Sequence, residues 1–224
     1  MTKKPTVLIL PNLLKIACNN INRSYKDLSL FELGPIFNDV DNITPTQSLA
    51  AIRIGANQPK NIHSIAREFN IFDIKSDLES IFSYSSLEID KCQIQDTAPN
   101  YYHPTRSATI SLGKNVIVYF GQIHPLILKT FDIECDVMAF EIDLSKLPIT
   151  KEKFGKKSKL KISDYQMINR DYAFIIEESQ KIGEILSFIK NIDKNLIKNV
   201  NLFDVYHGNK IEKGKKSIAI SVII

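Results

Sequence analysis

Two histidines and an arginine are the side chains in this sequence best suited to chemistry. His103 and His124 are each followed by a proline, and Arg106 comes three residues after the first of them. Imidazoles act as general acids, general bases and metal ligands, so a catalytic or metal site is one interpretation. No cysteine or acidic ligand stands at a spacing that completes a zinc shell. We therefore favour a structural role, in which each ring bonds to a loop carbonyl and Arg106 pairs with a carboxylate.

A lysine-rich turn near the end of the chain is the second candidate. It superficially resembles a phosphate-binding loop, but five residues rather than four separate Gly208 from Gly214, and a strand rather than a helix follows. These differences reject a phosphate loop. The lysines of the turn fit an RNA-facing cluster or a solvated turn equally well, and the pattern leaves both open for Lys213, Lys215 and Lys216.

A β-hairpin is expected to position the two histidines. Residues 109–112 alternate between polar and apolar, residues 113–115 supply a turn, and residues 116–120 form a β-branched and aromatic return strand. A proline after each histidine favours an extended or turn conformation. Both imidazoles should therefore lie at the same end of the hairpin, on the rim of a pocket.

The other patterns up to residue 147 predict an antiparallel sheet with few helices. Gly34-Pro35 should bend one alternating segment into two short strands, and residues 38–48 should form a loop. The expected strands are Leu28–Phe37, Leu49–Gly55, Leu87–Gln95 and Val137–Leu144, and the expected helices are Leu13–Ile21, Phe72–Ser83 and Leu126–Phe131.

A second domain is expected after a change in composition. Residues 148–162 carry six lysines and little to bury, which is typical of an interdomain linker. Residues 163–224 then read as strand, helix, strand and strand, with the segments Arg170–Glu177, Ile182–Ile189, Val200–Tyr206 and Ser217–Ile224. This βαββ order opens a ferredoxin-like module, whose full pattern ends with another helix and strand.

Composition sets broad limits on the class of protein. The chain has 224 residues, 44% of them hydrophobic and 24% charged, with a formal net charge of +4. These values are typical of a soluble globular chain and permit a nucleic-acid partner without requiring one. The three cysteines are widely spaced, which favours a reducing cytosol over a disulfide framework. No apolar run is long enough to cross a membrane, so a cytoplasmic location without membrane contact is expected.

Several blocks of the sequence occur together in one known family. They are Asn19–Arg23 followed by Leu30–Gly34, then Tyr102–Ala108, Gly121–Pro125, Asn169–Asp171 and Leu202–Gly208 with Gly214–Ser217. In order and spacing they resemble the C-terminal part of the bacterial phenylalanyl-tRNA synthetase beta subunit, from about Leu10 onward. The resemblance implies an α+β fold. Residues 1–147 would be a class II synthetase-like module, and residues 163–224 a ferredoxin-fold anticodon-binding domain truncated at its C-terminus.

The resemblance also implies a division of labour between subunits. The complete enzyme joins phenylalanine to tRNA(Phe) with ATP and Mg²⁺, and the alpha subunit carries out the chemistry. This chain should bind no cofactor and contribute no catalytic residue, because Asn38 stands where active class II synthetases present an arginine to the ATP α-phosphate. Candidates for shared core or alpha-subunit interface are Leu30, Leu33 and Phe37. The alternative is a stand-alone RNA-binding or scaffold protein, the product of a broken gene, and an alpha-subunit pull-down separates the two.

The last strand suggests how RNA would bind. Along residues 217–224 one face is made of isoleucine and valine, while the other begins with small residues, so the first should meet the helix and the second should lie open. An open face with an aromatic side chain suits unstacked bases. The predicted RNA-binding residues are Arg170, Asp204, Tyr206, Lys215, Lys216, Ser217 and Ser221. An unpaired edge beside this apolar strand also predicts poor solubility.

Overall fold

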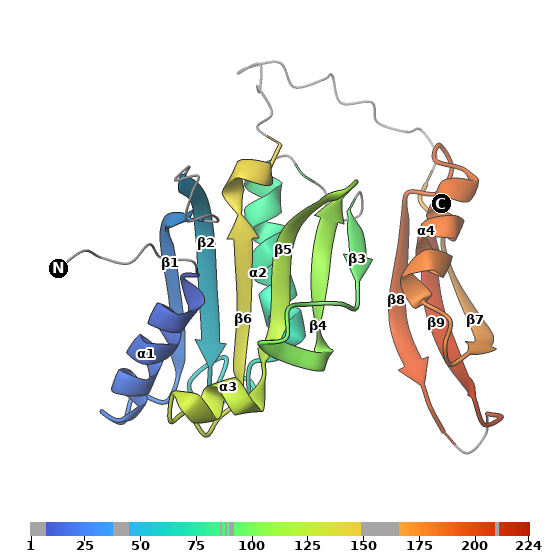
Figure 1. Cartoon of the computed structure of the whole chain (residues 1–224). Coiled ribbons are helices and arrows are strands. Elements are labelled where there is room, and N and C mark those ends of the chain that lie inside the picture. Colours follow the sequence, from blue (N-terminus) through green and yellow to red (C-terminus); the bar gives the residue numbers. More distant parts are fainter. Residues whose placement is uncertain are drawn as a thin grey trace. The chain divides into compact units, whose positions relative to one another are not determined.

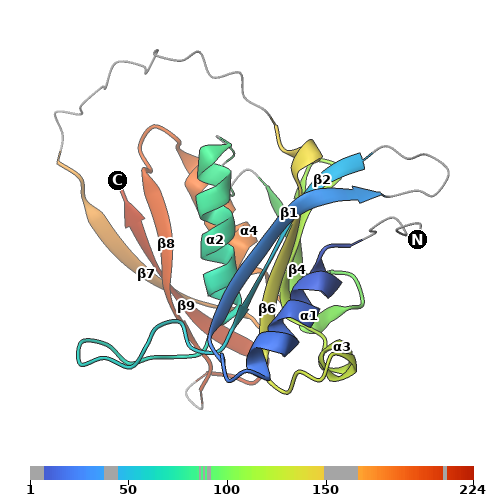
Figure 2. The same cartoon turned by 90° about the vertical axis from the view of Figure 1, so that its left-hand side faces the viewer.

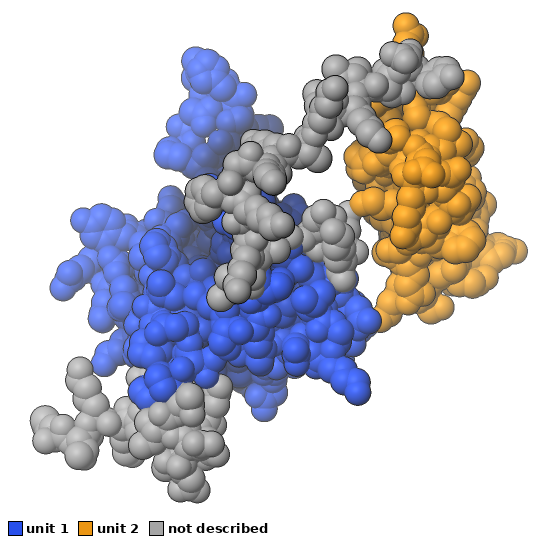
Figure 3. Space-filling model, turned by 90° about the horizontal axis from the view of Figure 1, so that it is seen from above, with its two compact units in different colours: residues 1–152 blue, residues 153–224 orange. Residues whose placement is uncertain are grey.

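The computed structural model describes residues 8–37, 45–85, 87, 89, 92–148, 166–208 and 211–224. The chain divides into two compact units, Met1–Glu152 and Lys153–Ile224, which we call unit 1 and unit 2 (Figure 3). The predicted linker, residues 148–162, lies outside the described residues except for Pro148, so its role stays a prediction.

Unit 1 is built on a six-stranded antiparallel sheet with the strand order β1-β2-β6-β5-β4-β3 (Figure 1). Its strands are β1 (Leu28–Phe37), β2 (Pro45–Ile54), β3 (Gln93–Gln95), β4 (Tyr102–Leu112), β5 (Asn115–Ile123) and β6 (Val137–Asp143). Its helices are α1 (Leu10–Ile21), α2 (Ile71–Tyr84), α3 (Pro125–Thr130) and the short 3₁₀ helix η2 (Leu144–Lys146). The predicted antiparallel sheet with few helices is confirmed.

Helices cover both faces of this sheet, α1 on one side and α2 on the other (Figure 2). The α1 side buries a cluster that includes Leu14, Ile52 and Ile123, whereas the α2 side buries Leu78 and Phe140 among others. Asn70 caps the start of α2 by accepting the amide of Phe72, and Asp73 completes a capping box. Successive residues of the inner strands therefore pack alternately into two separate cores, which explains why these strands are apolar almost throughout.

The hairpin β4–β5 forms as expected but is longer than the sequence pattern indicated. Gly113 has a φ of +60° in the tight turn, a backbone conformation that glycine adopts without strain. The ladder is irregular between Tyr102 and Ser107 of β4, where Gly121 of β5 has a φ of +143°. A Cβ at Gly121 would overlap the backbone of β4, so this glycine permits the close approach of the two strands.

Three details of unit 1 differ from the expectation. The predicted bend at Gly34-Pro35 is wrong, because β1 pairs with β2 without a break through Gly34↔Ser48 and Pro35↔Gln47. Proline is tolerated there since β1 is the outer strand of the sheet. Residues 45–48, expected in a loop, already belong to β2, and the strand expected from Leu87 begins only at Gln93.

The described residues of unit 2 form a three-stranded antiparallel sheet and one helix, and they confirm the predicted βαββ order. The elements are β7 (Asn169–Glu177), α4 (Ile182–Ile192), β8 (Asn199–Tyr206) and β9 (Lys215–Ile223), with β9 in the centre of the sheet order β7-β9-β8. Helix α4 packs apolar side chains, among them Ile185 and Leu186, against the buried Ile218, Ile220 and Val222 of β9.

Candidate nucleic-acid and partner interfaces

Strand β9 has one covered and one open face, as its sequence predicts. Ile218, Ile220 and Val222 are at most 5% exposed beneath α4, whereas the intervening Ser217, Ala219 and Ser221 are half-buried. The described part of unit 2 contains no helix over this second face. We call it the open face.

A β-bulge in β8 brings two further predicted residues onto the open face. Val200 and Leu202 pair with Val222 and Ile220 and so lie on the helix side. The register then shifts, so that Asp204 pairs with Ala219 and Tyr206 with Ser217. Residues paired directly in an antiparallel ladder share a face. Without the extra residue of the bulge, positions 200, 202, 204 and 206 would all share one face.

The ring of Tyr206 lies against Gly208. A Cβ at position 208 would overlap the phenol ring of Tyr206, and the side chain of Tyr206 remains 44% exposed. Glycine at position 208 thus lets the tyrosine lie against the backbone at the end of β8 while its ring stays open to solvent.

The predicted cations of this site do not gather on the open face. Arg170 pairs with Val222, and Lys216 pairs with Ile176, so both residues stand at helix-side positions of the register. The ammonium of Lys216 donates to the carbonyl of Glu178 at 2.7 Å. Of the predicted cationic residues, Lys215 alone takes an open-face position, opposite Glu177. The structure therefore separates the seven predicted RNA-binding residues into two groups.

Ion pairs and hydrogen bonds already engage several open-face residues. The ammonium of Lys215 lies 2.5 Å from a carboxylate oxygen of Glu212, which raises the pKa of Lys215 and lowers the pKa of Glu212. The hydroxyl of Ser221 bonds to Asn169 at 2.5 Å. The register also adds Ile175, which is 65% exposed opposite Ser217, to this face. Ile175 was not among the predicted residues, although the alternation in β7 indicates its side.

The histidine pair of unit 1 makes local hydrogen bonds, with different partners from those predicted. The two rings stack with centroids 6.4 Å apart. Nδ1 of His103 accepts the amide of Thr105 at 3.2 Å, and Nδ1 of His124 accepts the amide of Leu126 at 3.1 Å and caps α3. The expected bonds to loop carbonyls are therefore wrong for these nitrogens.

The partner of Arg106 also differs from the expectation. The guanidinium donates to the amide oxygen of Gln122 at 3.0 Å, where a carboxylate was predicted. Gln122 lies at the end of β5 and is buried, so this bond joins the two strands of the hairpin. Among the described residues no three of histidine, cysteine, aspartate and glutamate gather closely enough to hold a metal ion. Asn38 lies outside the described residues.

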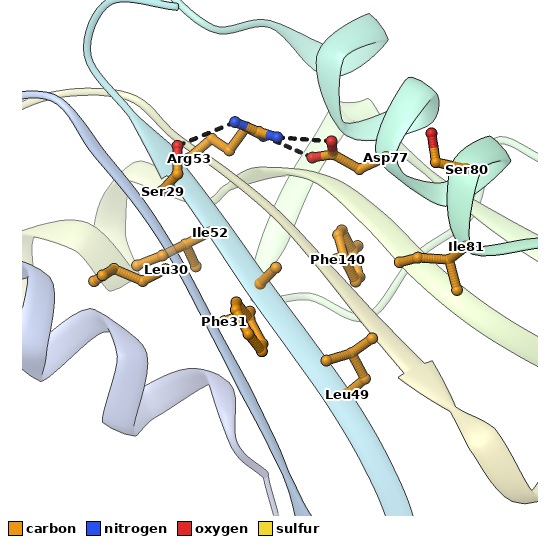
Figure 4. A pocket seen from close by; sticks show the side chains of 11 residues that line it. Ser29, Leu30, Phe31, Leu49, Ile52, Arg53, Asp77, Ser80, Ile81 and Phe140 are labelled. Carbon is orange, nitrogen blue, oxygen red and sulfur yellow. Dashed lines mark hydrogen bonds and ion pairs between the residues drawn. The ribbon is translucent and has the colours of Figure 1, made fainter.

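An apolar groove of about 370 Å³ runs between α2 and strands β1, β2 and β6 of unit 1 (Figure 4). Phe31, Leu49 and Phe140 line it from the strands and Ile81 lines it from α2. At one end the Arg53 guanidinium makes two bonds to Asp77, at 2.6 and 2.7 Å, and a third to Ser29 at 3.0 Å. This network ties β1 and α2 to β2, so the groove has a fixed wall.

The predicted interface residues of β1 lie on different faces. Leu30 pairs with Ile52 and packs against the α1-side core, whereas Leu33 and Phe37 pair with Leu49 and Pro45 on the α2 side. Leu33 is 59% exposed, and its neighbour on that side, Phe31, is 75% exposed. Phe31 was not among the predicted residues, although the alternation along β1 places it with Leu33.

Comparison with known proteins assigns a family to each unit. Residues 7–144 match the model of the phenylalanyl tRNA synthetase beta chain CLM domain, and residues 163–224 match that of the ferredoxin-fold anticodon binding domain. The chain belongs to the phenylalanyl-tRNA synthetase beta-chain family. Its two units combine an antiparallel synthetase-type sheet with a ferredoxin-fold domain, as the sequence predicted.

Relatives within this family cover the chain almost completely. The phenylalanine–tRNA ligase beta subunit of Rickettsia bellii is 52% identical over 98% of this chain and 25% of the relative, and that of Rickettsia prowazekii is 50% identical over 98% and 27%. The chain thus spans about a quarter of the length of these relatives. A pyrrolysyl tRNA synthetase from Desulfitobacterium hafniense aligns over 63% of this chain and 48% of its own, at 9% identity and a TM-score of 0.47, too low to carry an argument.

One further observation concerns membranes. Within the part of the chain that the structure describes, no helix combines the length and the apolar character needed to span a bilayer.

Proposed function

We propose that this chain is a noncatalytic part of a phenylalanine–tRNA ligase beta subunit, in which unit 2 binds the anticodon of tRNA(Phe) and unit 1 docks on the alpha subunit. The complete enzyme would join phenylalanine to its tRNA in the cytoplasm with ATP and Mg²⁺, and the alpha subunit would perform the chemistry. The observation that carries the proposal is the shared open-face placement of Tyr206, Asp204 and Ser217 in an anticodon-binding fold.

The open face has the chemistry that unstacked bases require. An exposed tyrosine offers a stacking surface, and such contacts are worth about 1 to 3 kcal/mol per base. The Asp204 carboxylate can accept N–H groups from the Watson–Crick edge of a base, and the Ser217 hydroxyl can donate or accept. Small residues at positions 219 and 221 leave room for a base to lie close to the sheet.

The charges of this face suggest how binding should depend on salt. Asp171, Glu177 and Asp204 share the open face with Lys215, while Arg170 and Lys216 stand on the helix side. Each phosphate neutralised by a cation adds roughly −0.7 to the slope of log K against log salt for single strands. Because Lys215 is the one cation at an open-face position among the described strand residues, we expect a shallow slope and recognition that relies on stacking.

Docking on the alpha subunit would use the groove and the edge of β1. Phe31 and Leu33 expose apolar surface beside the groove, and in the described residues β1 pairs with a neighbour on one edge alone. A long exposed strand edge with apolar side chains is a liability unless another chain covers it. A partner that fills the groove with an apolar side chain would satisfy both features.

Titration with a labelled anticodon stem-loop of tRNA(Phe) tests the RNA-binding half of this proposal. Tyr206→Ala should weaken binding about 5- to 150-fold, which corresponds to the loss of one base stack of about 1 to 3 kcal/mol. Tyr172→Ala is the matched control, because Tyr172 is 46% exposed on the helix side of the same sheet. Equal affinities for the two variants would contradict the proposal.

A further inference from the structure

A second cavity lies on the α1 side of unit 1. It has a volume of about 320 Å³ and is bordered by Tyr101, by Tyr119 of β5 and by Glu141 of β6. Ile36 of β1 contributes apolar surface. Tyr119 and Glu141 are direct partners in the β5–β6 ladder and so face the cavity side together.

Glu141 is an unusual residue for the middle of a sheet. It is 8% exposed, and β6 has a paired strand on each side of it. Its Oε2 accepts the hydroxyl of Tyr101 at 2.8 Å and that of Tyr102 at 3.4 Å. Burial raises the pKa of Glu141, an effect that the two hydroxyls oppose. A carboxylate held in such a place is costly to ionise unless a cation or further donors compensate it.

The second carboxylate oxygen of Glu141 faces the cavity. The hydrogen bonds from Tyr101 and Tyr102 both end at Oε2, and no described residue donates to Oε1. At the same time, every fully buried side-chain nitrogen or oxygen among the described residues has a hydrogen-bond partner. Oε1 is therefore not fully buried. Because Glu141 lines the cavity, Oε1 is accessible to a ligand from the cavity.

We propose that this cavity binds a small organic cation, with a primary ammonium group at Oε1 of Glu141 and an attached short apolar chain against Tyr101, Tyr119 and Ile36. The carboxylate supplies a charge-assisted hydrogen bond, and the two aromatic rings add cation–π attraction at a desolvated site. The remaining wall is apolar enough to accept an alkyl chain.

Other ligand classes fit the cavity less well. A metal ion would need several oxygen ligands, and no metal-binding group of three acidic, histidine or cysteine residues occurs in the described chain. An anion would meet the carboxylates of Glu141 and Asp143. The cation that could offset them, Lys146, lies 3.0 Å from Asp143 and is already paired with it. Neither alternative leaves a favourable partner for Oε1.

Titration of the full chain with n-hexylammonium, followed by backbone amide NMR, tests the inference. We expect saturable binding with shifts at Tyr101, Tyr119 and Glu141, and at least tenfold weaker binding of the neutral n-hexanol. Glu141→Gln should weaken n-hexylammonium binding at least tenfold. Glu134→Gln, which removes an exposed carboxylate of the same unit, should change it less than twofold.

Equal binding of n-hexanol, or unchanged binding by Glu141→Gln, would overturn the inference. If Glu141→Gln does not fold, the side-chain carboxyl carbon of Glu141 in the unmodified chain decides: its chemical shift must move with n-hexylammonium and stay unmoved with n-hexanol. None of these measurements involves tRNA or the alpha subunit, so they stand apart from the proposed function.

Discussion

The two sheets of this chain differ in how many of their faces are covered. In unit 1 helices lie on both faces of the sheet, so the side chains of its strands pack into two cores. The largest exposed apolar side chains of β1 lie beside the apolar groove at the edge of the sheet. In unit 2, α4 covers one face, and the other carries Tyr206, Asp204 and small residues. A doubly covered sheet suits a scaffold that docks by its edge, whereas a singly covered sheet can present a binding platform.

The contrast between the two faces of unit 2 predicts the largest effect. Ile220→Ala should lower the free energy of unfolding of unit 2 by about 2 to 5 kcal/mol, because it leaves a cavity beneath α4 at a residue with 0% exposure. Ser221→Ala on the open face should lower it by about 1 kcal/mol or less, because it removes one exposed hydrogen bond to Asn169 and leaves no cavity beneath α4. Denaturant titrations followed by the amide signals of β9 measure both. Similar losses would mean that the second face is also covered.

The second largest effect is expected on binding of the alpha subunit, where an exposed phenylalanine of β1 is compared with an exposed phenylalanine elsewhere in unit 1. Phe31→Ser should weaken binding to the alpha subunit by about 1 to 2 kcal/mol, since an aromatic anchor would leave the partner's pocket. Phe72→Ser is the matched control, because Phe72 of α2 is 73% exposed compared with 75% for Phe31 and lies outside the residues that line the groove. Co-purification and calorimetry with purified alpha subunit distinguish the two. If the alpha subunit binds both variants as tightly as the unmodified chain, β1 is not part of the interface.

The contributions of Glu141 in unit 1 and Asp193 in unit 2 to stability should respond to pH with opposite sign. Burial raises the pKa of Glu141 in unit 1, so the folded state holds its proton more tightly than the unfolded chain. The stability that this proton contributes is lost as the pH rises above the ordinary glutamate range. The advantage of Glu141→Gln over the unmodified chain should therefore grow from about pH 4.5 upward and level off above the raised pKa.

Asp193 provides the opposite case in unit 2. The amides of Leu196 and Asn195 lower the pKa of its carboxyl group, so its contribution is present above about pH 4 and is lost as the pH falls through the lowered pKa. Asp193→Asn should thus approach the unmodified chain in stability only under acid conditions. Thermal unfolding between pH 3 and pH 8 checks both variants. The same sign for the two variants would contradict the assigned environments.

The smallest effect on stability and on stem-loop affinity is expected for Gly208→Ala. The added methyl group would overlap the ring of Tyr206, and because that ring is the free end of a side chain, it can turn away without unfolding β8. We expect unchanged stability within about 0.5 kcal/mol and a loss of stem-loop affinity smaller than that of Tyr206→Ala. Selective labelling of tyrosine would follow the ring by NMR. Unchanged ring signals would mean that position 208 does not hold Tyr206 in place.

The sequence predicted most elements and the two faces of β9, because strict alternation of isoleucine or valine with small residues indicates a strand with one buried and one open face. It did not predict how side chains from different strands combine. Arg170 and Lys216 were grouped with Tyr206, yet their ladder partners Val222 and Ile176 put them on the other side. Assigning such residues to a face requires the register between strands, which no single segment contains.

Two other differences have equally specific causes. The bulge between Leu202 and Asp204 changes the alternation of β8, and the sequence pattern carries no clear sign of it. The hydrogen-bond partner of His103 lies two residues along the chain, and that of Arg106 lies across the hairpin. Several other polar groups lie equally close in the sequence, so the pattern alone does not select these partners. By contrast, Phe31 and Ile175 could have been found by applying alternation to both faces of β1 and β7.

Photo-crosslinking tests the central claim, that the open face of unit 2 binds the anticodon, most directly. An anticodon stem-loop of tRNA(Phe) with 4-thiouridine in its loop would be irradiated with the chain, and the linked peptides mapped by mass spectrometry. We expect links to Tyr206 and its neighbours in β8 and β9, and we expect Tyr206→Ala to reduce them. Links concentrated at Tyr172 and Phe174, which stack on the helix side of β7, would contradict it.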